Sequence, residues 1–111
     1  MTSHEKEFDG LLRDCIESTL KEVLGEASSA TVICHIGSDR LSEGIEFFAE
    51  ALERIFGAGA HILERLILQK LYSRAEVELE EKTGYEFADY VKETKTIWLS
   101  QRKKQETQKR Q

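Results

Sequence analysis

Apolar side chains recur at intervals of three and four residues along most of this chain, which is the spacing of an amphipathic helix. The first such stripe lies in residues 4–24, and Gly25 follows it at the position where a left-handed residue ends many helices. The stripe comprises Phe8, Leu11, Leu12, Cys15, Ile16, Leu20, Val23 and Leu24. The pattern therefore predicts a first helix that ends at Gly25.

The run of residues 30–36 is rich in β-branched side chains, so its pattern is compatible with a strand as well as a helix. Ser28 and Ser29 precede it, and serine is a favoured N-cap residue. A single strand in a helical chain would have no partner for its backbone hydrogen bonds, so a helix is favoured. Residues 37–41 predict a loop, and Ser42 is a candidate cap for the next helix.

The strongest apolar signal lies between residues 45 and 72, where two stripes flank the glycines Gly57 and Gly59. We expect the first, phenylalanine-rich stripe to be core and the glycines to form a kink or tight turn. The second stripe covers more than one helical face, which is typical of a central helix or a subunit interface. The first stripe comprises Ile45, Phe47, Phe48, Ala51, Leu52, Ile55 and Phe56. The candidate core and interface residues are Phe48, Leu52, Ile55, Phe56, Ile62, Leu63, Leu66, Ile67, Leu71 and Trp98.

The last third of the chain divides into a connector, a final helix and a polar tail. Acidic residues 75–82 are interpreted as a connector whose form the pattern does not define. A helical stripe then begins at Tyr85 and stops at Leu99, while helix-compatible polar residues continue to the end. We therefore interpret residues 1–100 as a helical domain and residues 101–111 as a basic polar tail, either a helix extension or frayed.

Composition supports a helical class. The 111 residues include no proline and seven glycines, too few turn residues for a fold of many short strands. A chain of this length forms one domain, and its 40% hydrophobic and 33% charged residues argue against disorder and against a membrane class. We expect an all-α fold, a small bundle of about five helices with a long C-terminal helix. Because the apolar stripes exceed what a small monomer readily covers, we expect a homodimer.

Charge separates an acidic body from a basic tail. The net charge is -5, yet residues 101–111 hold five basic residues against one acidic residue. The first hundred residues therefore hold eleven basic against twenty acidic residues. The tail cations can contact phosphate or an acidic lipid face, or they can pair with the acidic body of the same or a neighbouring subunit. These candidate phosphate contacts are Arg102, Lys103, Lys104, Lys109 and Arg110.

Candidate chemistry is sparse. Cys15 and Cys34 do not form a CxxC pair, and the adjacent Cys34 and His35 would point about 100° apart on a helix of ~3.6 residues per turn. The glycines at 57 and 59 lack the third glycine and the lysine that phosphate-binding loops require. We therefore predict no catalytic residue, no metal and no cofactor. The charged N-terminus has no apolar signal core, so a cytoplasmic protein that does not enter a membrane is expected.

Residues 46–72, with similar features in the first stripe and in residues 85–91, resemble a small archaeal helical family, the Nitrosopumilus output domain type 5. The resemblance covers about residues 8–95. It rests on the phenylalanine-rich helix, the Ile55-Phe56-Gly57-Ala58-Gly59-Ala60 turn and the apolar helix ending in Lys70-Leu71-Tyr72. It implies an output or interaction role in archaeal signalling and transfers no catalytic residue. The family's proline-containing acidic loop is replaced here by residues 38–42 without proline, which leaves the role of that loop open.

These observations together predict a non-enzymatic helical interaction or output module that self-associates and contacts a signalling or transcriptional protein. The alternative is a nucleic-acid-binding protein that uses the basic tail, although the acidic body lacks the broad positive field of such proteins. A small enzyme using Cys15, Cys34 or His35 is the third possibility, and it would need a polar cleft that the pattern does not indicate.

Overall fold

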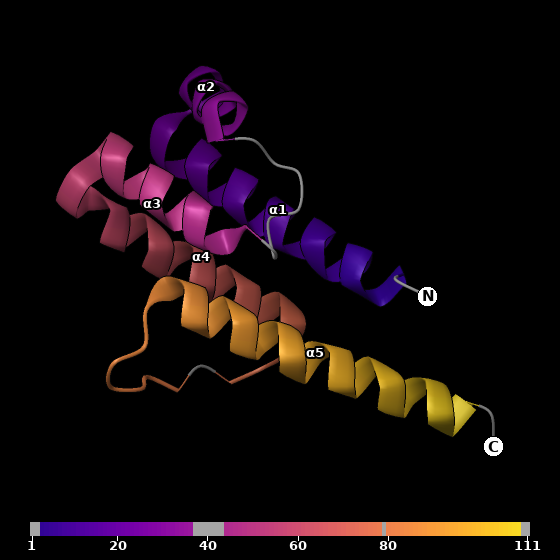
Figure 1. The fold of residues 1–111 in the computed structure, drawn as a ribbon. Helices are drawn as coiled ribbons and strands as arrows, with labels where there is room; N and C mark the ends of the chain where they lie inside the picture. Colours follow the sequence, from indigo (N-terminus) through magenta and orange to yellow (C-terminus); the bar gives the residue numbers. More distant parts are fainter. Residues whose placement is uncertain (1–2, 37–43, 79, 110–111) are drawn as a thin grey trace.

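The computed structural model describes residues 3–36, 44–78 and 80–109, with side chains described from His4 to Cys34 and, beyond the gaps, up to Arg102. All regular structure in these ranges is helical, which confirms the all-α prediction. Figure 1 shows the helices packed side by side. They are α1 (Ser3–Leu24), α2 (Glu26–Ile36), α3 (Ile45–Phe56), the 3-10 turn η1 (Gly57–Gly59), α4 (Ala60–Ala75) and α5 (Phe87–Lys109).

The junction of α1 and α2 is a single glycine. Gly25 has a φ of 85°, a left-handed conformation that glycine adopts without steric cost, and its N–H donates to the Lys21 carbonyl at 2.9 Å. The segment whose pattern allowed a strand is therefore the helix α2. The expected serine cap is wrong, because α2 already begins at Glu26, whose acidic side chain suits a helix N-terminus. Ser29 lies inside the helix and donates to the Glu26 carbonyl.

A tight hairpin joins α3 to α4. Gly57 has a φ of 57° and a ψ of -130°, a backbone conformation open to glycine and strained for other residues. Gly59 has an ordinary helical conformation instead. The predicted loop at 37–41 and the predicted cap at Ser42 lie outside the described residues, and α3 is preceded by Gly44 without a side-chain cap.

Helix α4 is the centre of the bundle. It packs against α1, α3 and α5, and Figure 1 shows it between α3 and α5. Three of its faces therefore contact other helices, which explains why its apolar stripe is so broad. The fully buried large apolar residues come from all four of these helices, and each contributes about 1.5–3 kcal/mol by burial. They are Phe8, Leu12, Leu20, Ile45, Leu52, Ile67, Leu71 and Val91.

The connector between α4 and α5 is held by its own contacts. The Tyr90 hydroxyl accepts from the Lys82 N–H at 2.9 Å and lies 3.2 Å from the Lys82 carbonyl, while the Lys82 ammonium pairs with Glu93 at 2.7 Å. Helix α5 begins at Phe87, whereas the apolar pattern predicted a start at Tyr85. The start is fixed by a side-chain cap, in which the Glu86 N–H donates to the Asp89 carboxylate at 2.9 Å.

The far half of α5 continues without a break past the last apolar stripe. Trp98 is buried against Phe8, with ring centroids 5.8 Å apart, and the Arg102 guanidinium lies 4.7 Å from the Trp98 ring centroid. The backbone then remains helical to Lys109, so most of the predicted tail is a helix extension. Figure 1 shows these turns extending beyond the end of α4. In the parts of the chain that the structure describes, no helix is both long and apolar enough to cross a membrane.

Candidate functional site

The structure separates the candidate core and interface residues into buried and exposed groups. Most of them fill the bundle, while Phe56 and Leu66 are half-buried. The buried members are Phe48, Leu52, Leu63, Ile67, Leu71 and Trp98. A single copy therefore buries most of the residues that the pattern predicted as core or interface.

Three large apolar side chains of the hairpin stay outside the core. Phe47 is 75% exposed, Ile62 is 67% exposed and Ile55 is 44% exposed. The expectation that the whole phenylalanine-rich stripe is core is therefore wrong for Phe47 and Ile55. Phe47 follows Ile45 by two residues, about 200° around the helix, so it faces away from the buried stripe. Ile55 follows Phe48 by seven residues and points in nearly the same direction, but it lies in the last turn of α3, beside the hairpin. Ile62 lies on the outer face of α4.

The cysteine and histidine candidates do not converge. Cys15 is fully buried, and burial raises the pKa of its thiol, so it behaves as a small apolar side chain. Cys34 is exposed on α2, and the side chain of His35 lies outside the described residues. Within the described ranges, no three His, Cys, Asp or Glu side chains are placed to share a metal ion.

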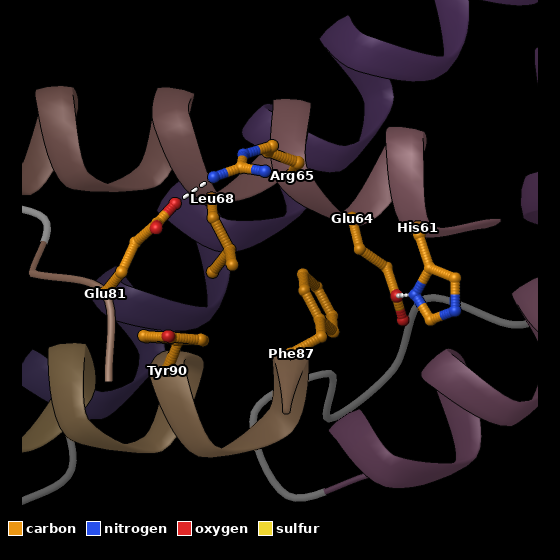
Figure 2. Close-up of a pocket in the computed structure, with 7 residues that line it drawn as sticks. All are labelled: His61, Glu64, Arg65, Leu68, Glu81, Phe87 and Tyr90. Carbon is orange, nitrogen blue, oxygen red and sulfur yellow. Dashed lines mark hydrogen bonds and ion pairs between the residues drawn. The ribbon is translucent and has the colours of Figure 1, made fainter. Parts of the chain in front are cut away.

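A hollow surface lies instead where α3, α4 and the start of α5 meet. Two adjoining cavities of about 310 Å³ and 510 Å³ share His61, Glu64 and Phe87, and we call them together the acidic groove. Figure 2 shows Leu68, Phe87 and Tyr90 pointing into the space between α4 and α5. The lining of the groove consists of Glu46, Ala49, Glu50, Glu53, His61, Glu64, Arg65, Leu68, Glu81, Tyr85, Glu86, Phe87, Ala88 and Tyr90.

Each wall of the groove follows from local sequence. Glu46, Glu50 and Glu53 are spaced by four and three residues, so they form one flank of α3 beside its buried stripe. His61 and Glu64 come from the first turns of α4, directly after the hairpin. The connector and the first turn of α5 complete the site, because the cap and the Tyr90 contacts join them to each other and Arg65 of α4 pairs with Glu81 of the connector.

Some carboxylates of the groove are neutralised within the chain. Arg65 pairs with Glu81, and Lys92 pairs with Glu46. His61 Nδ1 lies 3.3 Å from Glu64 Oε1, as Figure 2 also shows. In contrast, Glu50, Glu53 and Glu86 have no ion-pair partner among the described residues. We call these three side chains the uncompensated carboxylates.

Glu64 is the least exposed acidic residue of the groove, with 7% of its surface accessible. Burial raises the pKa of its carboxyl, His61 lowers it, and the nearby charges of Glu53 and Glu86 raise it further. Burial is the largest cause of this shift, so the surroundings of Glu64 disfavour its charged form even though His61 favours it. A cation that entered the groove would favour the ionised form of Glu64.

The floor of the groove is apolar and aromatic. Phe87 and Leu68 are buried, and the Phe87 ring packs on Phe48 with centroids 6.2 Å apart. Tyr85 and Tyr90 make an edge contact at 5.2 Å. A carboxylate rim above an aromatic floor suits ligands that combine a positive charge with an aliphatic stem, such as lysine and arginine side chains.

The groove could not be identified from the sequence. The spacing of Glu46, Glu50 and Glu53 was the available signal, because it marks an acidic helix flank, although most such flanks simply face water. The predicted tail residues are not part of the groove. Arg102 lies 15 residues after Phe87 on the same helix, which corresponds to about 22 Å at ~1.5 Å per residue.

Comparisons with known proteins find no relative, since no family model, curated protein or solved structure matches this chain.

Proposed function

We propose that this chain is a non-enzymatic helical interaction module whose acidic groove receives a basic segment of another polypeptide. The observation that carries the proposal is the combination of uncompensated carboxylates with a buried aromatic floor in one concave surface. Long-range attraction brings a basic partner to such a surface, and burial of its aliphatic stems holds it there. On the basis of the resemblance noted in the sequence, we propose a role in archaeal signalling or regulation, with a signalling or transcriptional protein as partner.

An enzyme is a weaker explanation of the same groove. The His61 and Glu64 pair is the only acid and base couple at hydrogen-bond range in its described lining. His61 itself is 77% exposed, so water has free access to the pair. A catalytic site needs a nucleophile or a bound reactant in a more protected setting than this one.

Nucleic-acid binding through the tail is the alternative function. The observation in its favour is the helical extension of α5, which carries its cations away from the acidic body. Such binding would require phosphate contacts by Arg102, Lys103, Lys104, Lys109 or Arg110 and would weaken steeply with salt. Deletion of residues 103–111 would then abolish a shift of labelled duplex DNA at low ionic strength.

The interaction proposal is tested with a labelled lysine- and arginine-rich peptide and its glutamate-substituted counterpart. Fluorescence anisotropy should show binding of the basic peptide only, and the affinity should fall as salt shortens the Debye length from ~10 Å at 0.1 M to ~3 Å at 1 M. Glu53→Lys should weaken binding several-fold, in line with ~0.2–1 kcal/mol per exposed charge pair lost and added repulsion.

The matched control is Glu26→Lys, which makes the same change of charge at the exposed start of α2, away from the groove. Equal affinities for the Glu53→Lys and Glu26→Lys variants would show that the peptide senses only net charge. That result would remove the groove as a binding site.

A further inference from the structure

We propose that the basic segment that occupies the acidic groove is the C-terminal end of α5 from a second copy of this chain. Two copies would exchange these ends across a two-fold axis, each inserting its own end into the groove of the other. This inference rests on the proposed function, because it names the partner for which the groove is built.

The charges of the two surfaces are complementary within one sequence. The last eleven residues hold five basic residues against one acidic residue, and the rest of the chain holds eleven basic against twenty acidic residues. The groove concentrates that acidic excess in Glu50, Glu53 and Glu86 above an aromatic floor. The tail contains no apolar residue after Leu99, so its aliphatic lysine and arginine stems are what it can offer to that floor.

The tail of a chain does not reach the groove of the same chain. Phe87 lies in the groove and is also the first residue of α5, whose backbone is helical to Lys109. At ~1.5 Å per residue the helix carries its last turn about 33 Å from the groove. Trp98 fixes the direction of the helix, since it is buried against Phe8 of α1. Contact between tail and groove therefore requires another molecule.

The backbone of α5 also continues past its contacts with α4. Figure 1 shows that the helix extends beyond the end of α4, which is the helix that supports its first half. A helical arm of this kind loses less conformational entropy on binding than a disordered tail, because its backbone is already ordered.

Two-fold exchange has a definite geometry. The groove lies at the start of α5 and the basic segment at its end, so mutual insertion requires that the two α5 helices run antiparallel. Each interface then contains two identical contacts, and the assembly closes at a dimer. Exchange without the two-fold axis would instead build an open chain of copies, which sedimentation distinguishes from a dimer.

The decisive experiment is a charge swap measured by sedimentation velocity. The groove variant carries Glu50→Lys and Glu53→Lys, and the tail variant carries Lys103→Glu and Lys104→Glu. Each variant alone should lose at least about tenfold in dimerisation affinity relative to the wild-type chain, because like charges face each other at both contacts. An equimolar mixture should recover the dimer, since each tail then meets a groove of opposite charge.

The Glu26→Lys variant should dimerise as the wild-type chain does, and circular dichroism should show that all variants keep their helical content. A wild-type chain that stays monomeric up to its solubility limit would overturn the inference. So would a groove variant that still dimerises, or a mixture that remains monomeric. Loss of duplex DNA binding in the tail variant of a monomeric protein would assign the tail to nucleic acid instead.

The failure of this inference is separable from the failure of the proposed function. The tail variant has an unoccupied groove in either case, so its binding of the labelled basic peptide tests the groove alone. Peptide binding by a chain that never dimerises would retain the interaction module and exclude a second copy as its partner. If the wild-type chain dimerises but the tail variant does not bind the peptide, the dimer interface lies elsewhere. That result would overturn both proposals.

Discussion

The two ends of α5 are built in opposite ways. At its start, Phe87 is buried between α3 and α4, the Asp89 carboxylate caps the helix, and Tyr90 binds the connector. At its end, after Trp98 and Arg102, the backbone remains helical to Lys109 and extends beyond the end of α4 (Figure 1). Tertiary contacts therefore hold the first half of α5 in place. The second half depends on helix propensity and on the direction that the buried Trp98 gives to the helix.

The largest expected effect concerns the point where these two halves meet. Trp98→Ala should destabilise the protein by about 3–5 kcal/mol, because it empties a buried site against Phe8. Urea unfolding followed by circular dichroism measures this loss. The exposed Ser100→Ala serves as control, with an expected change within about 0.5 kcal/mol. A small loss for Trp98→Ala would mean that the far half of α5 does not depend on this anchor.

A smaller effect is expected at the start of the helix. Asp89→Ala removes the acceptor of the Glu86 N–H and should cost about 1 kcal/mol of unfolding free energy. Asp89→Asn keeps an acceptor oxygen and should retain most of that stability. Thermal unfolding of the two variants side by side provides the measurement. Equal losses would show that the charge of Asp89 at the helix N-terminus, and not the hydrogen bond, is the stabilising element.

The smallest effect is a pH dependence within the groove. Burial raises the pKa of Glu64 above 4.5 in the folded state, so the folded protein holds this proton more tightly than the unfolded chain. The stability associated with the protonated form is complete below pH 4.5 and is lost as the pH rises through the raised pKa. Glu64→Gln should therefore be more stable than the wild-type chain at neutral pH, and this advantage should shrink on acidification.

Unfolding curves at several pH values measure that difference, with Glu78→Gln, at an exposed position of the connector, as the control. A Glu64→Gln variant that is less stable than the wild-type chain at neutral pH would contradict the assignment. It would indicate that the contact with His61 outweighs the cost of burying the carboxylate.

The sequence alone was sufficient for those features that depend on neighbours within one or two turns. Apolar spacing predicted the helices, and Gly25 predicted the end of α1, because helical side chains three and four residues apart share a face. Local reasoning failed for Ser28 and Ser29, since either serine suits a cap and nothing in their spacing shows that the helix already began at Glu26.

Tertiary structure decided which apolar residues are covered and where charges gather. Phe47 and Phe48 are adjacent and chemically identical, yet one is exposed and the other buried, because only one faces α5 and the core. The acidic groove combines α3, α4, the connector and α5, so no stretch of sequence contains it. Periodicity determines the faces of a helix, whereas the face that becomes a binding surface depends on which neighbouring helices cover the others.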